Sequence, residues 1–370
     1  MPTHAGSTPQ PSLPSPTSSP EIRVRDRDYL LDRHGIVFKV IGDVHPDTHY
    51  LGYVKYHPHS RGDRVLFGRS YQQNSVVPKS FGILARRPEC YVYSDVIGSV
   101  ITGVPRRDVV HHYSARHALT ELHHGMSREA EVLGVGGDLL SVVNRIAERG
   151  QLPLFGITGS FLVGCANRWS DIDLVSYGSE GYEAAQELFA DRDVIRAYEG
   201  EHLTRLYLRR AKYMEGSRFE TLIEQESRKL QGMTAGTGAH INCEPLRSDS
   251  PRSLDTMSAK EIGEITLLAT VADHSEGVLT PALYRIRVDR VLHSTVDEPE
   301  SFADKIVHLR SYLGAYTGAF RAGDSIHVMG RLVHLSHEGK DSFGVELTPW
   351  TASRSYLAGI APSMAAHNGS

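Results

Sequence analysis

Two aspartates separated by one residue are the clearest chemical feature of this chain. Asp171 and Asp173 lie in SDIDLVSYG, whose alternation is typical of a β-strand, so both carboxylates point to the same face. Carboxylates held this close repel each other unless a divalent cation lies between them. Mg²⁺ takes oxygen ligands and leaves positions open for substrate phosphates, and ligand type alone does not separate it from Mn²⁺. The spacing predicts that Asp171 and Asp173 are catalytic residues that bind Mg²⁺ (or Mn²⁺).

A glycine and a serine precede this pair. Gly159 and Ser160 end the short apolar run PLFGIT and open a segment, Phe161–Ala166, with the pattern of a brief helix. Glycine lets the backbone approach phosphate oxygens, and the N–H groups at a helix start favour anions. We therefore expect Gly159 and Ser160 to bind a nucleotide. Ser170, directly before the first aspartate, either belongs to the nucleotide site by orienting a carboxylate or only starts the strand.

The order of these residues resembles a known superfamily. Gly159-Ser160, ten intervening residues and then Asp171-Ile172-Asp173-Leu174 resemble the minimal motif of the DNA polymerase β-like nucleotidyltransferases. The longer segments GITGSFLVG, Arg25–Pro46 and Val104–Leu119 look like those of uncharacterised archaeal and bacterial nucleotidyltransferase-domain proteins. The resemblance implies a small sheet with helices on one side. It also implies that a third acidic residue on a later strand helps the two aspartates to hold the metal.

The strand-like segment HINCEPL offers one candidate for that third acid. His240, Asn242 and Glu244 share a face by the period of two, and Glu244 is the acid among them. We expect Glu244 to be the third catalytic and metal-binding residue, although the superfamily usually has Asp here. The alternative is that Glu244 is a surface residue at a strand end. Asp255 is the second choice for the third acid.

The elements that must position these residues suggest a mixed α+β or α/β chain. Its length of 370 residues fits two or three domains of roughly 100–200 residues each. Residues 1–20 are rich in Pro, Ser and Thr and predict a disordered tail. We expect a β-rich N-terminal module at 21–113, the nucleotidyltransferase domain at 114–250, and a small β-barrel-like, OB-like domain at 260–352. A helical stretch is expected around Phe302–Tyr316, and residues 353–370 are expected to form a flexible tail.

Two further segments leave alternatives open. Arg205–Lys212 and Arg228-Lys229 either hold phosphates or form a solvated mixed-charge helix face, and the second is the more common arrangement. Arg168-Trp169 either offers a stacking surface to a nucleotide or is a buried Trp beside a solvated Arg, and again we favour the second.

Composition limits the partners. The net charge is −4, so the chain as a whole lacks the basic excess of many nucleic-acid-binding domains. Three scattered cysteines predict neither disulfides nor a cysteine zinc site. No apolar stretch approaches the roughly 18–20 residues needed to span a membrane, so no membrane contact and a cytoplasmic protein are expected.

These features predict a nucleotidyltransferase. It would move a nucleoside monophosphate from a nucleoside triphosphate to an acceptor hydroxyl or phosphate and release pyrophosphate. The acceptor is a nucleic acid, a small molecule or a protein, and the residues do not choose among them. The alternative is a catalytically inactive module that senses a nucleotide or binds nucleic acid.

Overall fold

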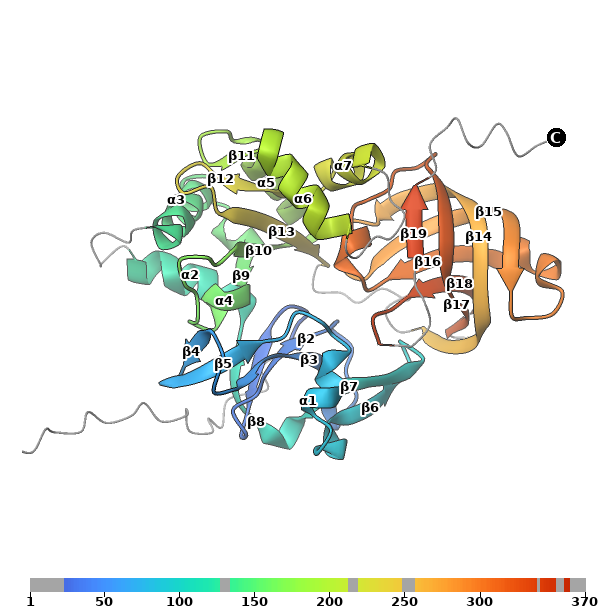
Figure 1. Ribbon diagram of the computed structural model, residues 1–370, viewed down its shortest axis with the longest axis horizontal. Coiled ribbons are helices and arrows are strands. Elements are labelled where there is room, and N and C mark those ends of the chain that lie inside the picture. The colour runs from blue at the N-terminus through green and yellow to red at the C-terminus, as the bar shows by residue number, and fades with distance from the viewer. Residues whose placement is uncertain are drawn as a thin grey trace, which may run out of the picture.

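The computed structural model describes residues 23–126, 134–211, 219–247, 257–337, 340–350 and 356–359. Within them lie three β-sheets and seven α-helices, so the mixed α+β class is confirmed. Each sheet occupies its own stretch of the chain, coloured blue, green and orange in turn (Figure 1). The expected disordered tail at 1–20 and the reserve acid Asp255 lie outside the described residues.

The N-terminal module is an eight-stranded sheet with a short helix. The expected hairpin is present, because β2 and β3 pair antiparallel with Val37 opposite Tyr56. The run Tyr91–Pro105 folds into a second hairpin, β6 and β7, which joins the sheet through β3. Its elements are β1 (Tyr29–Asp32), β2 (Val37–Val40), β3 (His49–Pro58), β4 (Arg64–Leu66), β5 (Arg69–Gln73), α1 (Lys79–Ile83), β6 (Tyr91–Ser94), β7 (Ser99–Pro105) and β8 (Val109–Tyr113).

The central part has a five-stranded sheet in the order β11-β12-β13-β10-β9. Strand β10 lies between β13, to which it is parallel, and β9, to which it is antiparallel. The elements are α2 (Ala115–Met126), α3 (Val135–Glu148), β9 (Phe155–Thr158), α4 (Gly159–Leu162), β10 (Ile172–Tyr177), α5 (Gly178–Ala190), β11 (Ile195–Arg196), α6 (Gly200–Ala211), α7 (Phe219–Ser227), β12 (Gln231–Thr234) and β13 (His240–Leu246).

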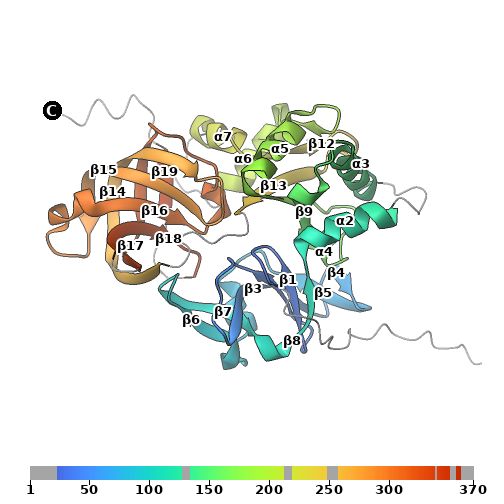
Figure 2. The same cartoon turned by 180° about the vertical axis from the view of Figure 1, so that it is seen from behind.

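The two faces of the central sheet have different neighbours. On one face Ile172 and Leu174 pack with apolar residues of α3 and α5. On the other face Val175 and Tyr177 pack against the N-terminal module, including Tyr56. Helices α3 and α5 are therefore on the side of the sheet opposite the module, and the view from behind shows them away from it (Figure 2). Asp173 is on the module side, because it alternates with Ile172 and Leu174.

The C-terminal part is a curled sheet built on long, bent strands. Its pairings run β14-β15-β16-β18-β17 and return from β17 to β14, with β16 and β18 parallel. Alternating apolar residues such as Leu267 and Ala269 fill the inside. The strands are β14 (Ser258–Glu276), β15 (Ala282–Ser294), β16 (Ile306–Ser311), β17 (Ser325–His337), β18 (Lys340–Leu347) and β19 (Tyr356–Gly359).

Two expectations fail in this region. The helical stretch expected at Phe302–Tyr316 consists of short 3₁₀ turns around β16, because pairing with β15 and β18 overrides the local apolar spacing. The expected flexible tail contains β19, which pairs with β17, so residues 356–359 are part of the sheet.

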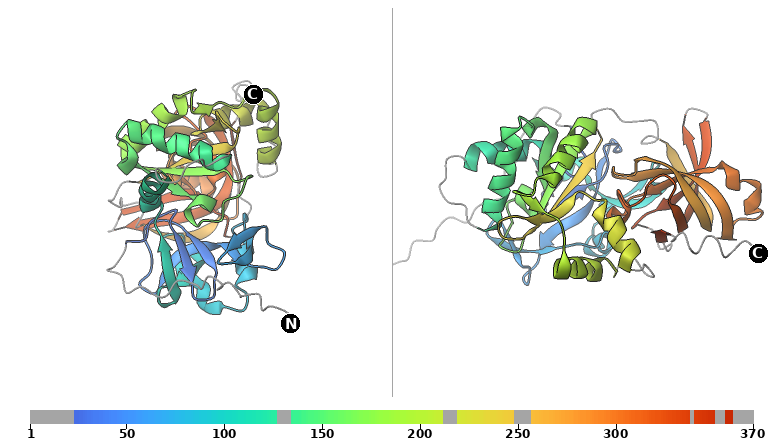
Figure 3. Two further views of the ribbon diagram at one scale, coloured as in Figure 1. Left: turned by 90° about the vertical axis from the view of Figure 1, so that its left-hand side faces the viewer. Right: turned by 90° about the horizontal axis from the view of Figure 1, so that it is seen from above.

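Buried arginines join the curled sheet to the N-terminal module. Arg331, which is completely buried, donates to the carbonyl of Gly98 at 3.0 Å, and Arg310 donates to the carbonyl of Val96 at 2.6 Å. Glu346, also fully buried, accepts from Arg310 at 2.8 Å. Figure 3 shows the three parts from two further sides. Among the described helices, none has both the length and the hydropathy to cross a bilayer.

Candidate functional site

The Asp-x-Asp pair lies where β10 begins. Asp171 directly precedes the strand, and Asp173 pairs with Thr158 of β9 on one side and Asn242 of β13 on the other. The Asn242 side-chain amide donates to a carboxylate oxygen of Asp173 at 2.6 Å. Asp173 is therefore fixed by its neighbour, while Asp171 is exposed to solvent.

Gly159 meets the Asp173 carboxylate from the opposite side. Its backbone is left-handed, with φ of +71°, and a Cβ added here would lie 2.2 Å from Asp173 Oδ2. A glycine is thus required both by the turn and by the closeness of the carboxylate. Ser160, the next residue, is buried at the start of α4. The fold brings together the two halves of the motif that the sequence separates by ten residues.

The charges at this position favour a bound cation. Desolvation and the neighbouring charge of Asp173 raise the pKa of Asp171 to about 6, although Arg209, Arg64 and Arg210 oppose the rise. A divalent cation between the two carboxylates would relieve this repulsion, and oxygen donors suit Mg²⁺ or Mn²⁺. Asp171 and Asp173 therefore fit a metal ion that takes its remaining ligands from water and phosphate.

Glu244, the expected third acid, makes other contacts. It is two residues beyond Asn242 on β13, opposite Val175, and forms ion pairs with Arg27 and Lys39 of the N-terminal module. Burial opposes its ionisation, but these two cations outweigh burial and hold the pKa of Glu244 at about 2. Within the described ranges, no group of three His, Cys, Asp or Glu side chains is arranged to hold a metal. Glu244 as a metal ligand stays a prediction.

A cavity of about 320 Å³ extends from Asp171 toward the curled sheet. Its lining combines Asp171, His240 and Asn242 of the central sheet with Thr280, Gly314, Thr317 and Gly318 of the C-terminal part. Arg210, Arg228 and Lys229 contribute positive charge to the wall. The volume is in the range of small-molecule sites, and the cations suit a phosphate-bearing ligand.

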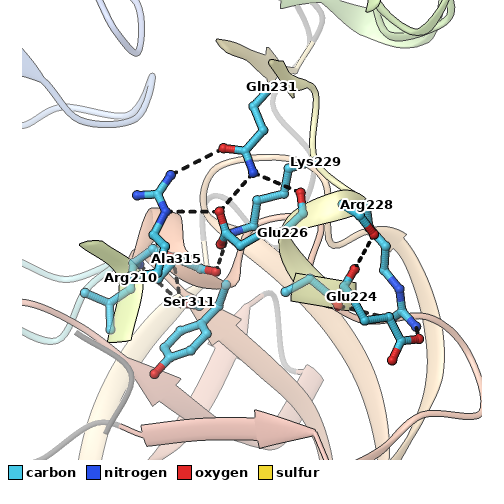
Figure 4. A network of polar contacts seen from close by, with 12 residues as sticks. Arg210, Glu224, Glu226, Arg228, Lys229, Gln231, Ser311 and Ala315 are labelled. Atoms are coloured by element: carbon cyan, nitrogen blue, oxygen red, sulfur yellow. Dashed lines mark hydrogen bonds and ion pairs between the residues drawn. The ribbon is translucent and has the colours of Figure 1, made fainter. Parts of the chain in front are cut away.

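A buried glutamate fixes two of these cations. Glu226 binds the Lys229 ammonium and accepts from Arg210 Nε at 3.0 Å and from Gln231 at 2.9 Å (Figure 4). Lys229 also donates to the carbonyl of Ala315 at 2.7 Å, which connects the network to the C-terminal part. The alternative reading of this basic segment as a solvated face is thus wrong for Arg210 and Lys229, which line the cavity.

His240 is held neutral beside the aspartates. Desolvation lowers its pKa to about 4, and Asp173 only partly opposes this. Its Nδ1 contacts the Tyr198 hydroxyl. A neutral imidazole in the cavity wall offers a hydrogen bond without adding charge.

The loop before Asp171 is fixed by Arg64 of β4. Arg64 donates to Ser170 Oγ at 2.9 Å and to the carbonyl of Cys165 at 3.3 Å. Ser170 Oγ also accepts from the Asn167 N–H at 2.9 Å. Ser170 therefore stabilises the loop that leads into the strand, and its place in a nucleotide site stays a prediction.

Trp169 corrects one expectation. Its side chain is 75% exposed rather than buried, and the Arg168 guanidinium lies 4.8 Å from the ring centroid. The Asn167 side chain accepts from the Trp169 N–H at 3.0 Å and keeps the loop turned outward.

No family model, curated protein or solved structure matches the chain. The assignment of the site therefore depends on geometry and on the motif. Sequence reasoning missed Asn242 and His240 although both share the face of Glu244, because it searched that strand only for acids. Nothing in the sequence indicated that Arg27 and Arg64 of the N-terminal module would contact the residues of this site.

Proposed function

We propose that this protein is a metal-dependent nucleotidyltransferase. The observation that carries the proposal is the closeness of Gly159 to Asp173, beside Asp171, which itself lines a cavity with three cationic side chains. The one-sided helical cover of the central sheet agrees with a polymerase β-like fold. In the C-terminal part, the pairing order β14-β15-β16-β18-β17-β14 of the curled sheet agrees with the expected OB-like barrel.

In this proposal Asp171 and Asp173 hold Mg²⁺ or Mn²⁺ together with the triphosphate. The bound cation would activate the acceptor hydroxyl and neutralise charge on the leaving group. Arg210 and Lys229 bind the phosphate oxygens, and their positions are fixed by Glu226. Gly159 allows the backbone to approach the nucleotide phosphates.

The reaction is an in-line displacement at the α-phosphorus. The acceptor oxygen forms a bond to phosphorus, and the bond from phosphorus to the bridging oxygen breaks. Pyrophosphate leaves with that electron pair, and the acceptor proton passes to water. The contribution of the protein is to position these groups and to balance their charge.

A second function is favoured by one contact. Asn242, an amide, occupies the position opposite Asp173, and Glu244 is engaged by Arg27. A site in which the described residues place two carboxylates together and Glu244 is held by Arg27 suits a protein that binds a nucleoside triphosphate without turning it over. Such a nucleotide sensor would bind the triphosphate and Mg²⁺ and release no pyrophosphate.

The test is pyrophosphate release from each of the four ribonucleoside triphosphates with Mg²⁺ or Mn²⁺. RNA, DNA, sugar and protein acceptors are supplied in turn. The proposal expects release that depends on an acceptor and is lost in the D171N/D173N double variant. Tight nucleotide binding with no release for any acceptor would favour the sensor. Turnover retained in the double variant would refute a site at these aspartates.

A further inference from the structure

An exposed tryptophan lies two residues before Asp171. Among the large hydrophobic side chains that the structure describes, Trp169 is the most exposed, at 75%. An indole presents a large apolar face with a polar N–H edge, and its ring offers a flat surface for stacking. Arg168 covers one side of the ring, with its guanidinium 4.8 Å from the centroid.

The loop that carries this ring is held in place. Asn167 and Ser170 bind each other across it, and Arg64 fastens it to β4. A ring presented on a fixed loop loses little conformational freedom when a partner stacks on it. The exposure of Trp169 is thus built into the fold and is maintained by three side chains.

Trp169 does not line the cation-lined cavity, and its loop reaches β10 from α4, which follows β9. Strand β10 is between β13 and β9 in the sheet. The cavity is lined from the β13 side, by His240, Asn242 and Lys229. In an in-line transfer the attacking and leaving oxygens are on opposite sides of the phosphorus. If pyrophosphate leaves into the cavity, the acceptor approaches past Trp169.

The strand that holds the Trp169 loop lies in an arginine-rich stretch, since Arg64 of β4 donates to Ser170 of that loop. The neighbouring stretch 59–73, which contains β4 and β5, has arginines at 61, 64 and 69 and one acid, Asp63. Arg61, Arg69 and Arg168 are exposed. An aromatic ring among arginines fits a single-stranded nucleic acid, whose bases stack and whose phosphates pair with cations.

From these observations we infer that Arg168 and Trp169 form the acceptor site, and that the acceptor is the end of a single-stranded polynucleotide. Its last base stacks on the open side of Trp169, and its phosphates contact Arg168 and the arginines of β4 and β5. Its terminal hydroxyl oxygen attacks the α-phosphorus, the proton passes to water, and pyrophosphate leaves. The role as acceptor rests on the proposed function, whereas strand binding does not.

The test uses the fluorescence of the full chain. The sequence has two tryptophans, and the other, Trp350, is 9% exposed and packs on Tyr312. Short single-stranded oligonucleotides of thymidine or adenosine, as DNA and as RNA, are titrated into the D171N/D173N variant. We expect quenching of the Trp169 emission, and an affinity that falls as salt rises. The W169A variant is expected to bind roughly tenfold more weakly or worse.

Controls separate stacking from general loss of an aromatic ring. Tyr93, exposed on β6, is replaced in Y93A, which is expected to bind like the parent protein. Equal affinity for W169A and its parent, or no quenching at low salt, would overturn the inference. Tighter binding of a duplex or of an acidic peptide than of a single strand would also overturn the inference. If the protein with both aspartates intact bound the strand but released no pyrophosphate from any nucleoside triphosphate, the strand-binding surface would stand and the transferase would be refuted. Pyrophosphate release with a small-molecule acceptor, without strand binding, would support the transferase and refute the strand-binding surface at Trp169.

Discussion

The side-chain amide of Asn242 donates to the Asp173 carboxylate at 2.6 Å, from the residue directly opposite on the parallel neighbouring strand. This is the position from which a third carboxylate would reach a shared metal ion. The amide satisfies one oxygen of Asp173 and adds no negative charge. At this position on β13 the chain therefore supplies a neutral partner to Asp173.

Replacing this amide by a carboxylate should strengthen metal binding. In N242D a third acid joins Asp171 and Asp173, and we expect the Mg²⁺ concentration for half-maximal nucleotide binding to fall about tenfold, or about 1.4 kcal/mol. N242A, which removes the hydrogen bond without adding charge, is the matched control. Calorimetric titration measures both. If N242D weakened Mg²⁺ binding as much as N242A, the geometry proposed for the metal would be wrong.

Gly159 should be more important for binding than for folding. In G159A the new methyl group would displace the Asp173 carboxylate, and the left-handed backbone adds about 1 kcal/mol of strain. Gly164 provides the control, because its φ is +74° but a Cβ there would meet no atom within 4 Å. We expect similar losses of thermal stability in G159A and G164A. Metal-dependent nucleotide binding should be lost in G159A alone, and equal affinity in the two variants would contradict this.

The raised pKa of Asp171 predicts how binding depends on pH. As the pH falls through about 6 the carboxylate becomes neutral, so Mg²⁺-dependent nucleotide binding should weaken below pH 6. For the stability of the metal-free protein, the effect of pH has the opposite sign to its effect on nucleotide binding. The native state holds this proton more tightly than the unfolded chain does, so stability falls as the pH rises from about 4 to about 6.

Asp171→Asn should therefore stabilise the metal-free protein at neutral pH. The gain should be below about 1 kcal/mol, because the side chain is exposed and its charge is screened. Thermal unfolding at several pH values, with and without Mg²⁺, measures both effects. Loss of stability in D171N without metal would show that Asp171 is held by its arginines rather than repelled by Asp173.

Glu244 should support Arg27 rather than bind metal. Its pKa of about 2 means that its contribution to stability is complete above about pH 4.5 and disappears as the pH falls through 2. At neutral pH, E244Q should lose about 2 kcal/mol of unfolding free energy, and its Mg²⁺ requirement should be unchanged. A steep rise in that requirement would instead make Glu244 the third metal ligand.

The interface between the N-terminal module and the curled sheet should be highly sensitive to Glu346. E346Q leaves the buried guanidinium groups of Arg310 and Arg331 without their shared charge, at a cost of about 3–5 kcal/mol. Glu261, 42% exposed, also pairs with Arg331 at 2.8 Å, yet E261Q should cost below about 1 kcal/mol. Urea unfolding compares the two. Equal costs would mean that burial adds nothing to this ion pair.

The sequence predicts the local part of the site. A strand with Asp171 and Asp173 on one face, and a glycine at the preceding turn, follow from periods of a few residues. The contacts of Asn242 and Glu244 depend on the register between β10 and β13, and those of Arg27 depend on how a separate sheet packs on this one. The local residue pattern predicts neither the register between the two strands nor the packing of the two sheets.

Two predictions from the sequence, the burial of Trp169 and the helix at Phe302–Tyr316, are wrong for physical reasons of the same kind. Trp169 is hydrophobic, and hydrophobicity alone favours burial. However, the Asn167 side chain accepts a hydrogen bond from the Trp169 N–H, and Arg64 donates one to Ser170, and these bonds keep the loop outward. Residues 306–311 have spacing compatible with a helix, but β15 and β18 provide partners for both edges of an extended strand. In each case a tertiary contact outweighs the local tendency.

The ion pair between Arg27 and Glu244 joins residues 217 positions apart, and the contact of Arg331 with Gly98 joins residues 233 apart. Such contacts form late, because a long loop must close before they add any stability. The cavity beside β10 takes part of its wall from Gly314, Thr317 and Gly318, far along the chain from the motif. We therefore expect the proposed nucleotide site to be complete only after the curled sheet has docked, so that nucleotide affinity appears late in refolding.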